Sequence, residues 1–148
     1  MAGAGAQQGA SVSTAKRVGY VIAVAVNAAM LWSANQLLAW GWPSWLTGEF
    51  EDVLPAINRS LVASILANLA YVFYDRSWFK SLTQIVVLVI SLQATIALLA
   101  VFPFDFSTYA INWDAVARVV LVVAVVGIVI AIISEAVKLG KAIKATSA

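Results

Sequence analysis

The chain has 148 residues with a mean hydropathy of +0.94, and only 11% of its residues are charged. A soluble domain needs about 25% charged residues to solvate its surface, so this composition excludes an ordinary soluble globule. The chain contains no Cys and no His, which excludes disulfides and thiolate chemistry and removes the usual haem and zinc ligands and the commonest general base. The formal charge of +2 gives no indication of a nucleic-acid partner, and no catalytic, cofactor-binding or metal-binding residues are predicted.

The N-terminal segment is predicted to be a disordered cytoplasmic tail over residues 1–17, because uncharged Gly, Ala, Gln, Ser and Thr make up nearly all of it. The first membrane span is predicted over residues 18–40. At ~1.5 Å per residue this helix covers roughly 34 Å, enough to cross the ~30 Å hydrocarbon core. A signal peptide is the rival interpretation, since Lys16 and Arg17 precede an apolar run. The run is longer than a signal core of ~7–15 residues, which favours a membrane span.

The second and third spans are predicted over residues 56–74 and 81–102. Pro55 suits the first turn of the second span, where its missing N–H costs nothing, and Pro103 ends the third. The third span contains a β-branched stretch that would favour a strand in water. In a bilayer every backbone N–H must be satisfied within the segment, which favours a helix instead. Residues 75–80 form a short connection, so these two spans should be antiparallel neighbours.

The fourth span is predicted over residues 115–137, with Asn112 or Asp114 as alternative N-caps. The remaining residues, 138–148, are predicted to form a basic cytoplasmic tail. Together the spans predict an all-α fold, an integral-membrane four-helix bundle in which one four-span domain covers residues 18–137.

The distribution of Lys and Arg predicts the orientation of this bundle. Four spans put both termini on one side of the membrane, and that side receives all but two of the nine Lys and Arg residues. The positive-inside rule makes it the cytoplasmic side, so the sequence predicts a multi-pass bacterial inner-membrane protein with both termini inside. Only Arg59 and Arg118 lie toward the outer side, whose longest loop is expected to contain a short interfacial helix near residues 49–54. The basic residues of the cytoplasmic side are Lys16, Arg17, Arg76, Lys80, Lys138, Lys141 and Lys144.

Three amide side chains lie deep within the predicted spans. Asn27, Asn68 and Gln93 are each roughly 10–20 Å from either end of their spans at ~1.5 Å per residue, and we predict that they form one polar layer across three helices. The favoured interpretation is hydrogen bonding across helices, at about 0.6 kcal/mol each on average. A polar permeation path is the alternative. No charged residue lies near the middle of a span, which argues against proton-coupled transport.

A second group of candidate residues forms a predicted charge cluster on the outer face. Asp114 and Arg118 are spaced i,i+4 and are expected to pair on one helix face. Arg59 is expected to snorkel outward or to pair with Asp105 or Asp114. Anchoring of helix ends is the role expected, and an outer basic site for a lipid phosphate is the alternative. The aromatic segment 102–107 is expected to be an interfacial anchor or plug.

Small residues recur at helical spacing in the second and fourth spans, as in Ala117, Ala124 and Ala131. Close packing through small residues drives helix association in lipid. Packing within the bundle is the expected use, and a homodimer seam is the alternative. The predicted partners are therefore the lipid bilayer and either a second copy of the chain or another membrane protein.

Four segments carry a resemblance to known sequences, and they read KRVGY, SLVASILANLAYVFYD, WFKSL and VFPFDFS. Together they resemble a group of uncharacterised small four-span bacterial membrane proteins, over residues 16–137. The resemblance implies the topology and a bacterial origin. It implies no activity and no functional residues.

The leading functional prediction is a non-enzymatic structural or accessory component of the membrane. A small oligomeric transporter or channel is the alternative, although the small multidrug transporters carry a Glu inside their first span and this chain does not. An enzyme acting on lipid is the third interpretation. Its acids and bases would be the outer charged residues, with no nucleophile–base pair evident beside them.

Overall fold

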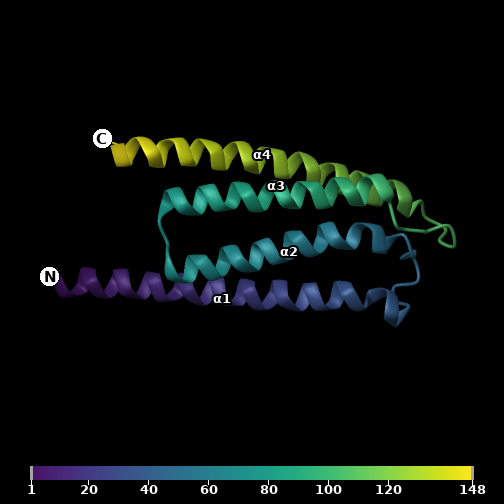
Figure 1. The fold of residues 1–148 in the computed structure, drawn as a ribbon, viewed down its shortest axis with the longest axis horizontal. Coiled ribbons are helices and arrows are strands. Elements are labelled where there is room, and N and C mark those ends of the chain that lie inside the picture. Colours follow the sequence, from purple (N-terminus) through teal and green to yellow (C-terminus); the bar gives the residue numbers. More distant parts are fainter. Residues whose placement is uncertain (1, 148) are drawn as a thin grey trace.

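The computed structural model describes residues 2–147, which form four helices and no β-strand. Figure 1 shows these helices running alternately up and down, with both chain ends at the same end of the molecule. Each helix is long and apolar enough to cross a membrane, which confirms the predicted all-α four-helix bundle. The helices are α1 (Ala2–Trp40), α2 (Phe50–Phe73), α3 (Ser77–Val101) and α4 (Trp113–Ser147).

The helices pack in the order in which they occur along the chain. α1 packs against α2, α2 against α3, and α3 against α4, and within the described residues no other pair of helices makes a close backbone approach. The four helices therefore form a single row with α1 and α4 at its two edges (Figure 1). Because α1 and α4 do not meet, the row is not closed into a ring of four helices.

The few buried side chains lie mainly on the two middle helices. Among residues 14–145, α1 and α4 carry no fully buried side chain. This pattern is compatible with a multi-pass membrane protein, since lipid tails are as apolar as Leu and association in lipid does not require a buried apolar core. The buried residues of α2 are Phe50, Val53, Ala56, Leu61, Ala67 and Tyr71, and those of α3 are Ser81, Val87 and Ala94.

Four helix ends differ from the predicted span ends by four residues or more: the starts of α1, α2 and α3 and the end of α4. α2 begins at Phe50, so the short interfacial helix expected near residues 49–54 is the first turn and a half of α2 and not a separate element. Two acidic residues in this turn, Glu51 and Asp52, suit the positive end of the helix dipole. Pro55 consequently lies inside α2, one turn later than predicted.

The two predicted tails continue the outer helices in the structure. α1 begins at Ala2 and α4 ends at Ser147, whereas the sequence predicts a disordered segment over residues 1–17. Once a helix is nucleated, each further residue adds one backbone hydrogen bond, and Ala-rich segments extend a helix readily. At the opposite end of α4, the backbone N–H of Ala115 donates to Asn112 Oδ1 at 3.2 Å, so Asn112 is the N-cap of the two alternatives.

The two loops at the far end of the bundle are joined by backbone hydrogen bonds. The N–H of Thr47 donates to the Pro103 carbonyl at 2.9 Å, and the N–H of Asp105 donates to the Trp45 carbonyl at 2.7 Å. The Trp45 ring packs beside the rings of Phe104 and Phe106, with centroids 5.6 and 5.3 Å away. The aromatic segment after α3 is therefore a tie between loops, which connects the α1–α2 end to the α3–α4 end.

Candidate functional site

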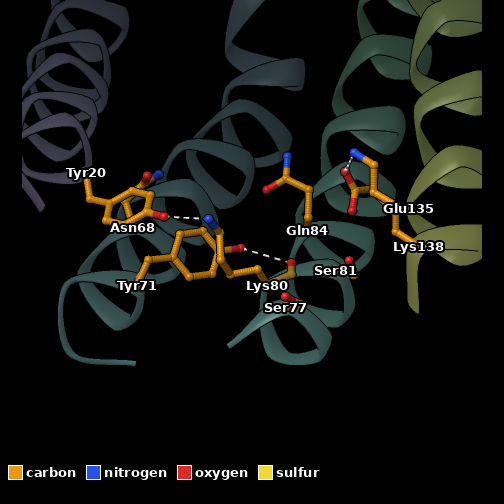
Figure 2. Close-up of a pocket in the computed structure, with 9 residues that line it drawn as sticks. All are labelled: Tyr20, Asn68, Tyr71, Ser77, Lys80, Ser81, Gln84, Glu135 and Lys138. Carbon is orange, nitrogen blue, oxygen red and sulfur yellow. Dashed lines mark hydrogen bonds and ion pairs between the residues drawn. The ribbon is translucent and has the colours of Figure 1, made fainter. Parts of the chain in front are cut away.

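A polar cavity of about 590 Å³ lies at the end of the bundle that carries both chain ends. All four helices contribute to it, although α1 and α4 do not pack against each other. Figure 2 shows the side chains that line it. They are Tyr20 of α1, Asn68 and Tyr71 of α2, Ser77, Lys80, Ser81 and Gln84 of α3, and Glu135 and Lys138 of α4.

One polar stripe of α3 forms the largest part of this lining. Its four residues, Ser77, Lys80, Ser81 and Gln84, are spaced i, i+3, i+4 and i+7, so they share one helix face. The stripe begins at the N-terminus of α3 and extends roughly 10 Å along its axis at ~1.5 Å per residue. The cavity therefore brings polar groups to a depth where the neighbouring surface of the helix is apolar.

Lys80 connects three parts of the chain at one edge of the cavity. Its Nζ donates to Tyr20 Oη at 2.5 Å and lies 3.2 Å from Asp75 Oδ1. The Tyr20 hydroxyl in turn donates to Asp75 Oδ1 at 3.1 Å, and Lys16 Nζ lies 3.6 Å from Asp75 Oδ2. This cluster of Lys16, Tyr20, Asp75 and Lys80, the Lys80 cluster, ties α1 to α3 through the link between α2 and α3.

The carboxyl group of Asp75 responds to this cluster. Partial burial raises the pKa of Asp75. Hydrogen bonds from Lys80 and Tyr20 and the positive charges of Lys80 and Lys16 lower this pKa, and together they outweigh the effect of burial. The net effect holds the pKa of Asp75 below its ordinary value. Asp75 therefore remains ionised throughout the neutral range and keeps its ion pairs there.

Two tyrosine rings flank the ammonium group of Lys80. Lys80 Nζ lies 5.1 Å from the ring centroid of Tyr20 and 5.8 Å from that of Tyr71, within the range of cation–π attraction. The two rings pack against each other with centroids 5.4 Å apart, and the Tyr71 hydroxyl donates to the Lys80 carbonyl at 3.4 Å. These contacts fix the position of Lys80 at the mouth of the cavity.

The opposite edge of the cavity carries a second ion pair. Lys138 Nζ lies 3.2 Å from Glu135 Oε1, and the Lys138 side chain is 63% exposed. Between the two pairs lies Ser81, which is 6% exposed. Within the described part of the chain, the structure records no hydrogen bond to its hydroxyl group. A hydroxyl group that faces a polar cavity and has no protein partner is a group that a ligand or a water molecule can satisfy.

The predicted layer of amides is not joined by hydrogen bonds in the structure. Asn27 Nδ2 donates to the Ala23 carbonyl and Asn68 Nδ2 to the Ser64 carbonyl, each at 2.8 Å and each on its own helix. Asn68 lines the cavity, whereas Asn27 and Gln93 do not.

Gln93 lies at a different height from Asn68. Gln93 lies two residues after Ser91 on α3, and the Ser91 hydroxyl is 2.9 Å from that of Ser60 on α2. Gln93 is therefore close to the level of Ser60. Asn68 lies roughly 12 Å further along α2 than Ser60 at ~1.5 Å per residue. The sequence correctly indicated that the amides lie within the spans, but not which groups they contact.

The predicted outer charge cluster is likewise dispersed. Within the described residues the structure records no ion pair among Arg59, Asp105, Asp114 and Arg118. Arg118 lies over the Phe102 ring, 4.0 Å from its centroid, and does not form the expected pair with Asp114. Asp105 Oδ1 accepts a hydrogen bond from the Ser107 N–H at 3.0 Å. Bonds from the side chain and the backbone of Ser107 lower the pKa of Asp105.

The cavity was missed at the sequence level, although a signal for it is present. The polar stripe of α3 and the pair Asn68 and Tyr71 of α2 both follow helical spacing toward the same end of the bundle. Within the described residues no cluster of acidic side chains is suited to a metal ion. No known protein family, curated protein or solved structure matches the chain, so the cavity and the charge distribution are the features from which a function is inferred.

Proposed function

We propose that this chain is a four-span integral protein of a bacterial inner membrane, with both termini in the cytoplasm. We further propose that it serves there as a non-enzymatic structural or accessory component. The membrane location is supported by four helices of spanning length and apolar composition. The bacterial origin is supported by the sequence resemblance described above.

The proposed orientation follows from the charges at the two ends of the bundle. The chain ends and the α2–α3 link lie at one end of the row (Figure 1). These segments contain all the Lys and Arg residues except Arg59 and Arg118. Positively charged segments are retained on the cytoplasmic side during insertion, so this end is proposed to face the cytoplasm.

The observation that carries the structural role is the pairing of the charges at the cavity. Lys80 is bound to Asp75 and Tyr20, and Lys138 to Glu135. The contacts of Lys80 join α1, the α2–α3 link and α3, and Lys138 and Glu135 pair within α4. Charged groups that are paired in this way hold the structure together, whereas a general acid or base must be directed at a substrate. The ionised side chains of this site therefore suit a scaffold better than a reaction centre.

The accessory role is tested by purifying the tagged chain from native membranes in a gentle detergent and identifying the copurifying proteins by mass spectrometry. A membrane-protein partner at fixed stoichiometry is the expected result. Purification of the chain alone, or only as copies of itself, would remove the accessory role and leave the second candidate.

That second candidate is a small oligomeric transporter or channel, and the cavity is the observation that favours it. A polar volume of about 590 Å³ lined by all four helices is a suitable entrance for a hydrophilic substrate. Reconstitution in liposomes and measurement of substrate-dependent flux tests this candidate. Flux that is lost on replacing Asn68 with Leu would favour transport over a structural role.

A further inference from the structure

We propose that the polar cavity at the cytoplasmic end binds a phosphate ester, and that the source of this ester is the headgroup of a phospholipid in the adjacent leaflet. The inference rests on three features of the cavity. They are the hydrogen-bond donors that face it, the excess of positive charge around it and its access from the lipid phase. It depends on the proposed membrane location but not on the accessory role.

The donors are arranged on the α3 stripe (Figure 2). Ser81 is a buried residue that lines the cavity, and the structure records no hydrogen bond to its hydroxyl group within the described residues. Ser77 and Gln84 add a hydroxyl and an amide on the same helix face. The stripe starts at the N-terminus of α3, where no side chain caps the helix. The free N–H groups and the positive dipole end of such a terminus favour an anion.

The charges around the cavity sum to a small positive excess. Lys16, Lys80 and Lys138 carry three positive charges against the two negative charges of Asp75 and Glu135. Glu135 would repel a phosphate if it were unpaired, but its ion pair with Lys138 offsets that charge. Basic pockets between membrane helices on the cytoplasmic side are suited to lipid phosphates.

The open row gives a lipid a route into the cavity. Because α1 and α4 make no close backbone approach to each other, the side of the bundle between them is not closed by a helix. A phospholipid can place its headgroup against the α3 stripe while its acyl chains stay in the hydrocarbon region. A soluble phosphate ester would instead enter from the cytoplasmic end, so the two sources differ in their need for acyl chains.

Binding is measured on the full-length protein, purified in detergent without added lipid, by native mass spectrometry. Three probes are titrated: phosphatidylglycerol, a diacylglycerol with the same acyl chains, and glycerol 3-phosphate. Tight binding of phosphatidylglycerol alone supports a lipid source. Equally tight binding of glycerol 3-phosphate supports the phosphate site with a soluble source. Equal binding of diacylglycerol and phosphatidylglycerol would overturn the proposal, because the phosphate would then contribute nothing.

Two variants locate the bound probe. Ser81→Ala removes a hydrogen-bond donor to a charged acceptor and is expected to weaken phosphatidylglycerol binding about tenfold. Lys138→Gln removes an exposed positive charge and leaves Glu135 unpaired beside the site, so it is expected to weaken binding by at least about threefold. Ser134→Ala and Lys141→Gln make the same chemical changes on α4 outside the lining and should leave binding unchanged. Binding that is insensitive to Ser81→Ala would place the lipid elsewhere and overturn the proposal.

A folding defect is separated from a binding defect by the thermal midpoint of each variant in detergent. Ser81→Ala is expected to unfold within about 2 °C of the parent chain without phosphatidylglycerol, since it leaves no unpaired charge. Lys138→Gln leaves Glu135 without its ion-pair partner, so its binding is compared with its own thermal midpoint in the absence of lipid. With phosphatidylglycerol the parent chain should gain stability and Ser81→Ala should gain less. Equal stabilisation of both chains would contradict a site at Ser81.

Discussion

Asn35 of α1 and Asn58 of α2 exchange two hydrogen bonds, one from Asn35 Nδ2 to Asn58 Oδ1 at 2.8 Å and one in the reverse direction at 3.2 Å. Asn35 Nδ2 also donates to the Leu31 carbonyl at 2.7 Å. The pair therefore fixes the register of α1 against α2 by a reciprocal contact between side chains. The sequence predicted that Asn27, Asn68 and Gln93 would bridge the helices. In the structure, a bridge between amide side chains of two helices is instead formed by Asn35 and Asn58.

Replacing either partner of this pair should destabilise the bundle. Asn35→Leu leaves the Asn58 amide without its partner in an apolar environment, and we expect a loss of about 1 kcal/mol, with ~2 kcal/mol as the upper end for such bonds in membranes. The double variant Asn35→Leu/Asn58→Leu should cost less than the sum of the two single changes. Unfolding in detergent micelles, followed by circular dichroism, measures all three.

Asn27→Leu provides the matched comparison within α1. Because Asn27 donates only to a carbonyl of its own helix, we expect this change to alter the free energy of unfolding by less than about 0.5 kcal/mol. A loss as large as that of Asn35→Leu would show that Asn27 contacts another helix after all.

The Lys80 cluster should make stability depend on pH in the acidic range. The pKa of Asp75 is lowered in the folded chain, so its contribution is complete above the ordinary value of about 3.9 and is lost as the pH falls through the lower folded value. The thermal midpoint of the parent chain should therefore approach that of Asp75→Asn only as the pH falls below about 4. A difference between the two chains that stays constant from about pH 4 down to about pH 2 would contradict this assignment.

The contact between the α1–α2 loop and the α3–α4 loop should depend on Trp45 and not on Trp42. Trp45 packs beside two phenylalanine rings, and each such ring pair contributes about 0.5–1.5 kcal/mol. Trp45→Ala should therefore destabilise the bundle by at least about 1 kcal/mol and expose the loops to protease. Trp42 is 69% exposed, so Trp42→Ala serves as the control and should leave the rate of loop cleavage unchanged.

The proposed orientation can be tested directly because the chain contains no Cys. Single variants Lys141→Cys and Ser107→Cys place one thiol at each end of the bundle. In intact cells, a membrane-impermeant maleimide should label Ser107→Cys and leave Lys141→Cys unlabelled until the membrane is broken. The reverse pattern would invert the topology, and labelling of both thiols in intact cells would refute four spans.

Sequence patterns predicted the number of helices because each run of apolar residues is as long as the membrane is thick. These patterns did not predict that the four helices pack in a single row, each only against its neighbours in the chain. The exposed residues of α1 and α4 are apolar on most sides, so no polar face indicates which side of either helix meets a neighbour.

The candidate site was harder to predict for a related reason. The depth of Asn27, Asn68 and Gln93 follows from residue counting, but their contacts depend on which way each side chain points. An Asn inside a helix can also bond to the carbonyl one turn earlier, as Asn27 and Asn68 do. The polar face of α3 was visible in the spacing of Ser77, Ser81 and Gln84, yet its meaning required the positions of α1, α2 and α4.

Four helices in a row have a longer outline in the plane of the membrane than the same helices in a square. With helices about 10 Å across, the row measures roughly 40 by 10 Å and has a perimeter of about 100 Å, against about 80 Å for a square. A longer perimeter recruits more boundary lipid per protein. Acyl-chain length should consequently affect this protein more strongly than a compact bundle of equal mass, because every boundary lipid shares the cost of a thickness mismatch.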